Sequence, residues 1–231
     1  IMLHSGSRHF GNVIGQHFNK IARELNRKYW SDVPESYNLP FLPVDTTEGK
    51  SYLNYMNLAM NFAFENRTVM LRKVKDIFSE NVQKFAGVTT EFSNEINCHH
   101  NYASLENHFD KDVWVHRKGA VRVSEGELSI IPGAMGSFSY IVKGKGNPES
   151  FMSSSHGAGR KLSRTKAVET FSVETVMTDL KKQDVVLGKN NKSDVAEESR
   201  FAYKDIDVVM ENQKDLVEPV KKLFTVGVVK G

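Results

Sequence analysis

The sequence predicts an α+β fold, with helices first and short strands later. Apolar side chains recur at the helical period of 3.6 residues in residues 11–29, and residues 51–85 are rich in Met, Phe and Leu. From residue 112 onward, Val, Ile and aromatic residues gather in short runs that Gly and Pro interrupt, as is typical of strands joined by tight turns. Because helices and strands cluster separately, α+β is favoured over a doubly wound sheet.

The elements of the first half follow from these patterns. Residues 11–29 predict an amphipathic helix, and residues 31–49 predict a loop because they contain three prolines. Residues 51–85 predict one or two helices. Strands are expected over residues 112–123 and 127–142.

The second half returns to helices before a final strand. Helices are expected over residues 160–169 and 172–183. The polar residues 188–200 predict an exposed loop. Residues 205–214 predict a short helix, and residues 223–231 a closing strand.

The composition suits a soluble globular protein. Of 231 residues, 39% are hydrophobic and 26% charged, and no apolar run approaches the roughly 18 residues of a membrane helix. The single cysteine, Cys98, cannot form an internal disulfide, which favours a reducing cytoplasm. A net charge of +3 permits an anionic partner without requiring one.

The chain opens on three apolar residues, Ile1-Met2-Leu3, with no Met at the first position. They run directly into the segment HSGSR and look like the end of a buried strand. We therefore expect the chain to be the C-terminal part of a longer protein. The alternative is a cloning boundary or a processing site.

The segment SSSHGAGRKLSR, residues 153–164, places one histidine before a turn of small residues. A neutral imidazole nitrogen of His156 can attack phosphorus when an acceptor holds its other nitrogen. Residues 157–159 would let backbone N–H groups approach a phosphate closely. If Arg160 begins a helix, Arg160 and Arg164 share one face and could clamp phosphate oxygens. The alternative is a Gly-rich turn before a helix with ordinary surface arginines.

Familiar nucleotide motifs do not explain these features. The chain contains neither GxxxxGK[ST] nor GxGxxG, and it lacks the KxDG lysine of many nucleic-acid ligases. A covalent nucleotide would therefore need another nucleophile, and His156 is the natural candidate.

Two other histidine segments could contribute to a metal site. His4 follows the first apolar run, and His99 and His100 stand in the segment EINCHHNY. Single histidines are more often structural than metal ligands, but two beside small polar residues could meet at a metal. Cys98 is a possible third ligand. In a strand it would share a face with His100 while His99 points away, which is equally consistent with packing.

A series of short motifs runs in order from His4 to Gly231 and covers essentially the whole chain: HSGSR, INCHHN, RKGA, IPGAMG, SY, SHGAGR, SRTKA, AYKDID and VVKG. Taken together, these motifs resemble the RtcB family of RNA ligases. The resemblance implies an RtcB-like fold, with residues 1–231 as the C-terminal portion of a single catalytic domain. It also implies an enzyme of transfer-RNA splicing and RNA repair. Such an enzyme joins an RNA 3′-phosphate or 2′,3′-cyclic phosphate to a 5′-hydroxyl, using GTP and Mn²⁺.

The resemblance also implies roles for individual residues. His156 would be guanylylated, and His4 and His100 would bind Mn²⁺. The residues implied for the guanosine nucleotide are Ser139, Ala158, Gly159, Tyr203 and Lys230. The residues implied for RNA phosphates are Arg8, Asn101 and Arg164. RNA and GTP are the expected partners, and an archease-type activator stays open as a third.

The sequence departs from the family pattern at specific places. The family also supplies an aspartate, a bridging cysteine and another histidine to its metals, all preceding HSGSR and absent from residues 1–231. Cys98 is not their counterpart. Ala134 replaces a common serine and removes a hydroxyl from the nucleotide site, and His9 replaces a usual glycine.

Two other functions stay open. A truncated, non-catalytic relative could keep the phosphate cradle and bind RNA or a nucleotide. A metal-dependent phosphohydrolase would explain the histidines but not the terminal Lys230.

Overall fold

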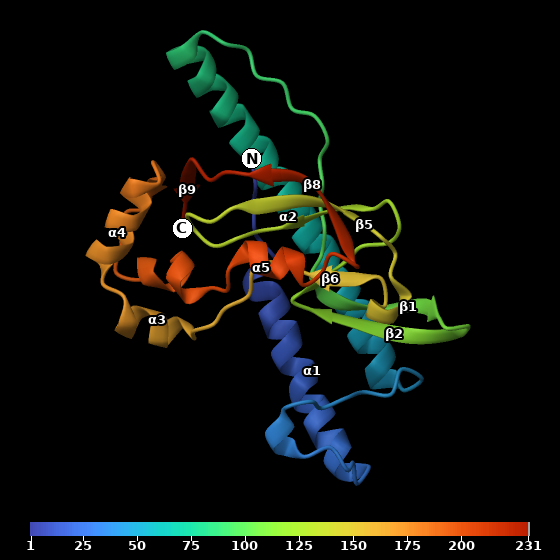
Figure 1. Cartoon of the computed structure of the whole chain (residues 1–231). Coiled ribbons are helices and arrows are strands. Elements are labelled where there is room, and N and C mark those ends of the chain that lie inside the picture. The colour runs from blue at the N-terminus through green and yellow to red at the C-terminus, as the bar shows by residue number, and fades with distance from the viewer. Residues whose placement is uncertain (231) are drawn as a thin grey trace. The chain divides into compact units, whose positions relative to one another are not determined.

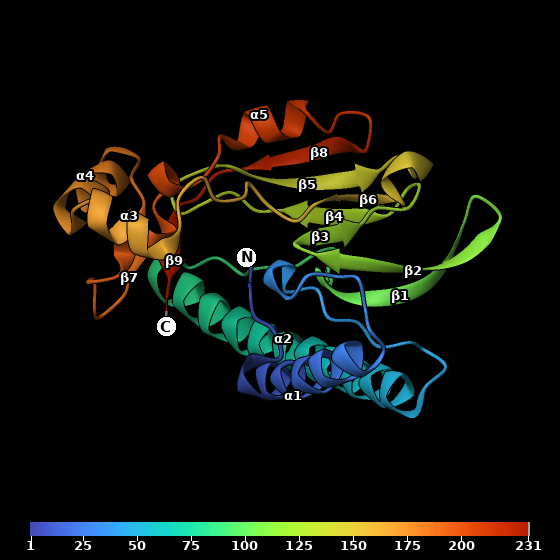
Figure 2. The same ribbon diagram turned by 90° about the horizontal axis from the view of Figure 1, so that it is seen from below.

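The computed structural model describes residues 1–230 and divides the chain into two compact units, residues 1–97 and the residues from 98 onward (Figures 1 and 2). The described residues form five α-helices and nine short strands, which confirms the α+β prediction. The first unit is helical, and all of the strands lie in the second.

Two long helices make up most of the first unit. They are α1 (Arg8–Lys28) and α2 (Thr47–Ala86), joined by a loop that contains the 3₁₀-helix Glu35–Tyr37. The two helices lie side by side (Figure 2). The buried Phe18 of α1 packs its ring 5.4 Å from the ring of Tyr52 and 5.7 Å from that of Tyr55, both on α2.

The sequence around α2 defines both of its ends. The Thr46 side chain accepts a hydrogen bond from the Gly49 N–H (3.0 Å) and caps the first turn. Gly87 ends the helix in the left-handed conformation, with φ +66°, and its N–H donates to the Gln83 carbonyl. Residues 51–85 therefore lie in one uninterrupted helix.

Residues 1–6 form no strand, so the expectation that His4 lies at a strand end was wrong. The segment is held instead by side chains of α2. Asn66 Nδ2 donates to Ser5 Oγ (3.0 Å), and Arg67 Nη1 donates to the Ser5 carbonyl (3.3 Å).

The second unit contains four small sheets. A β1–β2 hairpin, a β3–β6 pair and a β4–β5–β8 sheet are antiparallel, whereas β7 and β9 pair in parallel. The strands are β1 (Asn101–His108), β2 (Lys111–Lys118), β3 (Ala120–Arg122), β4 (Leu128–Ile131), β5 (Ser139–Gly144), β6 (Ser153–Ser155), β7 (Val186–Gly188), β8 (Val217–Leu223) and β9 (Gly227–Val229).

Three short α-helices complete this unit. They are α3 (Arg164–Thr170), α4 (Val173–Lys182) and α5 (Ile206–Glu211), accompanied by the 3₁₀-helices Pro148–Ser150, Val195–Glu198 and Arg200–Ala202. The helix expected over 172–183 and the short helix within 205–214 are confirmed. The expected strand over 112–123 is interrupted at Gly119, which separates β2 from β3.

Two apolar cores hold the second unit together. The larger core lies among the sheets and includes Val121, Ile131, Val142 and Ala158, with Cys98 packed against it. Cys98 is thus a packing residue. The smaller core surrounds α4, with Val176 and Leu180 buried.

The expected exposed loop at 188–200 is partly wrong. Its second half folds into the 3₁₀-helix Val195–Glu198, and Val195 and Ala196 are buried in the smaller core. The burial of these two small apolar residues holds Glu197 and Glu198 in fixed positions.

Candidate active site

His156 directly follows β6, and a backbone carbonyl fixes its ring. His156 Nδ1 lies 2.7 Å from the carbonyl oxygen of Gly119. A carbonyl can only accept, so Nδ1 carries the proton. In the neutral imidazole, Nε2 then holds the lone pair. This is the arrangement that a nitrogen nucleophile requires.

Gly119 is the residue on which this geometry depends. Its backbone is left-handed, with φ +71°, and an added Cβ would lie 3.2 Å from His156 Cε1. Its N–H donates to the His100 carbonyl (2.8 Å) and lies 3.3 Å from Asn101 Oδ1. One glycine therefore joins the His156 ring to the segment that carries His100.

The structure brings His100 and His156 together. Their rings stack with centroids 4.8 Å apart and an interplanar angle of 29°. His100 stands immediately before β1, and residues 98–100 lie outside that strand, so the strand alternation expected for Cys98 and His100 does not apply. Asn101, the first residue of β1 and one of the residues implied for RNA phosphates, directly follows His100 in the chain.

The turn after His156 packs tightly against the chain around Pro132. The Ala158 N–H donates to the Pro132 carbonyl (3.1 Å), and the Ala158 methyl group is buried in the larger core. A Cβ on Gly157 would meet the same carbonyl oxygen at 3.0 Å, and Gly159 has φ +73°. The expectation that all three amides face a phosphate therefore needs correction, because the Ala158 amide already has an acceptor.

The expected helix over 160–169 begins only at Arg164. The Ser163 side chain accepts from the Lys166 N–H (3.2 Å) and caps α3 there. Arg160 is extended and forms a bridge with Tyr203. Arg160 and Arg164 therefore do not share a helical face, and the clamp inferred from helical spacing was wrong.

Each of these arginines instead pairs with one of two adjacent glutamates. Arg160 Nη2 lies 3.3 Å from Glu198 Oε1, and Arg164 Nε lies 3.6 Å from Glu197 Oε2. The Arg164 side chain is 70% exposed, so its weak pair leaves it accessible to an external anion.

Glu198 also gathers two residues implied for the nucleotide. It accepts from the Tyr203 hydroxyl (2.8 Å), and Lys230 Nζ lies 3.2 Å from its Oε1. The Arg160 guanidinium lies over the Tyr203 ring, 4.6 Å from the centroid. Arg160, Glu198, Tyr203 and Lys230 thus form one polar cluster.

The charge states in this cluster follow from its geometry. Burial works to raise the pKa of Glu198, but the Tyr203 hydrogen bond and the charges of Lys230 and Arg160 outweigh it and lower that pKa. Burial and the Glu198 carboxylate raise the pKa of Tyr203 to about 12. Tyr203 is therefore a protonated donor and Glu198 an anion.

Ser139 begins β5, and its hydroxyl faces the preceding loop. Ser139 Oγ accepts from the Gly133 N–H (3.0 Å). The adjacent Pro132 holds Ala158 through its carbonyl. Ser139 thus belongs to the loop that supports the turn after His156.

His4 and Arg8 belong to the first unit, and the other predicted residues belong to the second. His4 stands in the irregular segment before α1, and Arg8 begins that helix with φ +55°. Among residues 1–230, no three His, Cys, Asp or Glu side chains cluster as a metal site. The described part of the chain therefore fits only a partial set of metal ligands.

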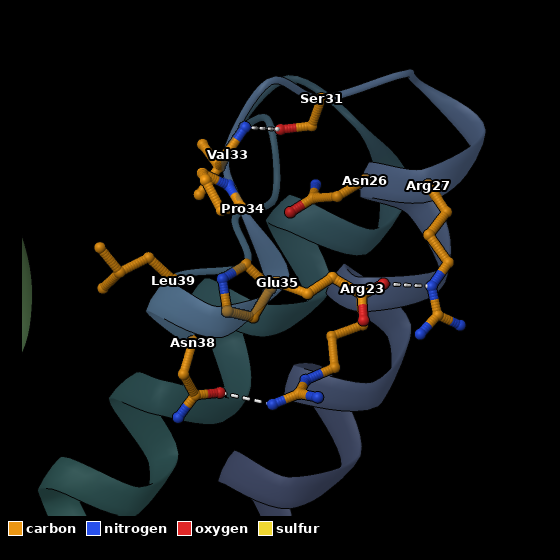
Figure 3. A pocket seen from close by; sticks show the side chains of 10 residues that line it. Arg23, Asn26, Arg27, Ser31, Val33, Pro34, Glu35, Asn38 and Leu39 are labelled. Carbon is orange, nitrogen blue, oxygen red and sulfur yellow. Dashed lines mark hydrogen bonds and ion pairs between the residues drawn. The ribbon is translucent and has the colours of Figure 1, made fainter.

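A cavity of about 290 Å³ lies at the end of α1 (Figure 3). Its two arginines already have partners. Arg23 Nη2 donates to Asn38 Oδ1 (2.5 Å), and Arg27 Nε pairs with Glu35 Oε1 (2.5 Å). No predicted site residue lines this cavity, and we assign it no ligand.

No helix within residues 1–230 is both long and apolar enough to cross a membrane.

Sequence comparison identifies relatives along the full chain. A family model described as tRNA-splicing ligase RtcB matches residues 1–231. The chain is 43% identical over 232 residues to the RNA-splicing ligase RtcB of Escherichia coli strain K12, covering 100% of this chain and 56% of that protein. It is 33% identical over 252 residues to the tRNA-splicing ligase RtcB of Methanococcus maripaludis, covering 100% of this chain and 52% of that protein. The chain spans about half the length of these curated relatives.

Proposed function

Because the chain belongs to the RtcB family, we propose that it is the part of an RNA ligase that carries the nucleophilic histidine. The proposed reaction joins an RNA 3′-phosphate or 2′,3′-cyclic phosphate end to a 5′-hydroxyl end at the expense of GTP. The observation that supports it most directly is the 2.7 Å contact between His156 Nδ1 and the Gly119 carbonyl, which leaves Nε2 as the lone-pair nitrogen.

In the proposed first step, His156 Nε2 attacks the α-phosphorus of GTP and pyrophosphate leaves. A 2′,3′-cyclic phosphate end is first opened by water, which breaks the bond from phosphorus to O2′ and leaves a 3′-phosphate and a 2′-hydroxyl. In the second step, an oxygen of the RNA 3′-phosphate attacks the phosphorus bound to His156, the P–N bond breaks, and GMP passes to the RNA. In the third, the RNA 5′-hydroxyl attacks the activated 3′-phosphate, loses its proton and displaces GMP. Each step is an in-line phosphoryl transfer between anionic groups, which cationic side chains stabilise.

We propose that the polar cluster around Glu198 binds the guanosine nucleotide. Tyr203 and Lys230 belong to that cluster, and Ser139 and Gly159 lie on the segments around the His156 turn. Ala158 would contribute through groups other than its N–H, which already donates to Pro132.

Arg8, Asn101 and Arg164 are the proposed contacts for RNA phosphates. The largely exposed Arg164 guanidinium supports this role, since a forked donor is suited to phosphate oxygens. Asn101 lies beside His100 and Gly119, close to the proposed nucleophile.

His4 and His100 are the proposed imidazole ligands for Mn²⁺, with the other ligands contributed by the rest of the enzyme. A bound Mn²⁺ would polarise phosphoryl oxygens and offset the charge of the leaving pyrophosphate. The stacking of His100 on His156 supports a position for this ligand beside the nucleophile.

The test is covalent labelling of the full-length protein with GTP in the presence of Mn²⁺. We expect a GMP adduct on His156 that is labile in acid and survives alkali, as a phosphoramidate should. His156→Ala should abolish the adduct, whereas His116→Ala, which removes an exposed histidine of β2, should retain it.

RNA that already carries a 3′-guanylyl cap should still be joined to some extent by His156→Ala, since the last step does not use the imidazole. A label on Ser153, Ser154, Ser155 or a lysine would contradict the proposal. Binding of GTP and RNA without any label would favour the non-catalytic alternative.

A further inference from the structure

Arg117, the arginine of the RKGA segment, is a charged side chain buried in β2 and only 2% exposed. A buried guanidinium is costly unless it is paired and hydrogen-bonded. Glu106 of β1 provides the pair, with Arg117 Nη1 2.5 Å from its Oε1 and Nη2 3.0 Å from its Oε2. This forked ion pair crosses the β1–β2 hairpin.

Other side chains of the hairpin hold Glu106 in place. Ser104 Oγ donates to Glu106 Oε1 (2.5 Å), and His108 Nε2 lies 2.9 Å from Oε2. A carboxylate can only accept, so His108 donates this bond. With the two bonds from Arg117, four donors fix the carboxylate, and the carboxylate in turn fixes the guanidinium.

The rest of the guanidinium reaches outside the hairpin. Arg117 Nε donates to Ser153 Oγ (3.0 Å), and Nη2 donates to the Phe151 carbonyl (2.9 Å). Within the hairpin, Nη1 also makes longer contacts of 3.4 Å with the Tyr102 hydroxyl and Ser104 Oγ of β1. Arg117 thus ties the hairpin to the segment that leads into His156.

The tied segment has an unusual backbone. Phe151 and Met152 both lie in the left-handed region, with φ 52° and 50°, although neither is glycine. Such conformations are unfavourable for residues other than glycine, and they persist where contacts with the surrounding structure hold the backbone in place. Arg117 Nη2 and Ser153 Oγ both donate to the Phe151 carbonyl, and the His108 ring meets the Phe151 ring edge-on at 5.1 Å.

The hairpin also carries the groups that contact His156. Gly119, whose carbonyl accepts from His156 Nδ1, stands two residues after Arg117. His100, whose ring stacks on His156, directly precedes β1. Because β6 leads directly from the Phe151–Met152 turn to His156, Arg117 contacts the segment that immediately precedes the histidine.

We propose that Arg117, held by Glu106, is a positioning residue for His156. By holding the Phe151–Met152 turn against the β1–β2 hairpin, Arg117 fixes the tautomer and the orientation of the His156 ring. This inference rests on the proposed role of His156 as the nucleophile. Arg117 itself touches no reacting atom.

The test uses the full-length protein and a variant designed to fold. Removing only one member of a buried ion pair leaves an uncompensated charge, whereas replacing both by apolar residues is often neutral for stability. The variant is therefore Arg117→Met with Glu106→Leu, which keeps apolar packing but removes the donors to Phe151 and Ser153. The matched control is Arg122→Met with Glu127→Leu, which removes a similar forked pair that is more exposed, on β3 and the following turn.

Two measurements are made. The first is the ¹⁵N chemical shift of the His156 ring nitrogens at one fixed pH, assigned by comparison with His156→Gln. The second is the single-turnover rate of guanylylation at saturating GTP. In the Arg117 and Glu106 variant we expect the Nδ1–H preference to be lost and the rate to fall by about 100-fold, as for a misplaced catalytic group. GTP affinity and the control variant should stay near wild type.

The outcomes separate this inference from the proposed function. A wild-type tautomer and rate in the Arg117 and Glu106 variant, with His156→Ala inactive, would overturn the positioning role and leave the function standing. A wild-type protein that shows no His156 adduct would overturn the function. In that case, the ¹⁵N chemical shifts of the His156 ring nitrogens would still show whether Arg117 determines the tautomer of that ring. Equal losses in the control pair would reduce Arg117 to a general stabilising residue and also overturn the inference.

Discussion

At the scale of single residues, Gly119 offers the most direct test of the His156 geometry. Gly119→Ala would strain a left-handed backbone and place a methyl group 3.2 Å from the His156 ring. We expect a stability loss of about 1–2 kcal/mol from the backbone alone. Guanylylation should also slow by about 10- to 100-fold as the ring is displaced. Chemical denaturation and single-turnover labelling would measure the two effects separately.

Gly126→Ala is the matched control for this prediction. Gly126 has a similar φ of +77°, but its added Cβ would meet only Lys143 Cε, at 3.9 Å. It should lose similar stability and label at the wild-type rate. Equal slowing in both variants would mean that strain, rather than the contact with His156, controls labelling.

The sequence indicates candidate residues such as His156, but it does not indicate which side chains contact one another. His156 stands out because it precedes a turn of small residues, and the structure gives its ring a carbonyl acceptor. Glu198 was missed because Tyr203, Arg160 and Lys230 converge on it from three separate places in the chain. Nothing in the local pattern of residues 188–200 indicates that convergence.

At the scale of elements, the helices were predicted more accurately than their ends, whereas the strands β1, β6 and β7 lie outside the expected strand ranges. The helix expected from residue 160 begins at Arg164, and Ser163 is a capping residue of the type that marks such a start. That signal could have placed Arg160 outside the helix. The tertiary bridge between Arg160 and Tyr203, by contrast, has no local signature.

The β1–β2 hairpin should lose part of its support in acid because of Glu106. Burial works to raise the pKa of Glu106, but hydrogen bonds from Arg117, His108 and Ser104 outweigh it and lower the pKa from 4.5 to about 2. A lowered folded-state pKa stabilises the fold above the unfolded value, and that stabilisation is lost as pH falls from about 4.5 toward 2. Urea denaturation across this range should show a steeper decline for wild type than for Glu106→Gln.

Glu106→Gln should itself be less stable than wild type at neutral pH, since it leaves Arg117 buried without a counter-charge. The expected cost is about 3–5 kcal/mol. The two stability curves should approach each other below pH 3. Parallel curves throughout would contradict the role given to this carboxylate.

At the scale of the whole molecule, the chain forms two compact units, and the predicted residues are divided between them. His4 and Arg8 belong to the first unit, and the remaining predicted residues belong to the second. The sequence showed no boundary at residue 97, because neither composition nor Pro and Gly content changes sharply there. The family motifs imply roles for individual residues, but they do not indicate this division into two units.

Metal binding by residues 1–231 alone should be weak. The described residues offer His4 and His100 as proposed ligands but no cluster of three ligating side chains, and Mn²⁺ prefers shells with more ligands and with oxygen donors. The chain covers 56% of the length of its Escherichia coli relative, and we propose that further donors come from outside residues 1–231. Titration calorimetry of this chain with Mn²⁺ should therefore give an affinity far below that of a longer protein that supplies the remaining proposed ligands.

Variants distinguish weak specific binding from nonspecific binding. If the imidazoles contribute, His4→Ala and His100→Ala should each weaken Mn²⁺ binding by the full-length enzyme, whereas His116→Ala, which alters an exposed strand position, should not. Tight stoichiometric binding by residues 1–231 would contradict the incomplete ligand set. Binding that neither histidine variant alters would instead place the metal on other residues, because loss of a true ligand must reduce affinity.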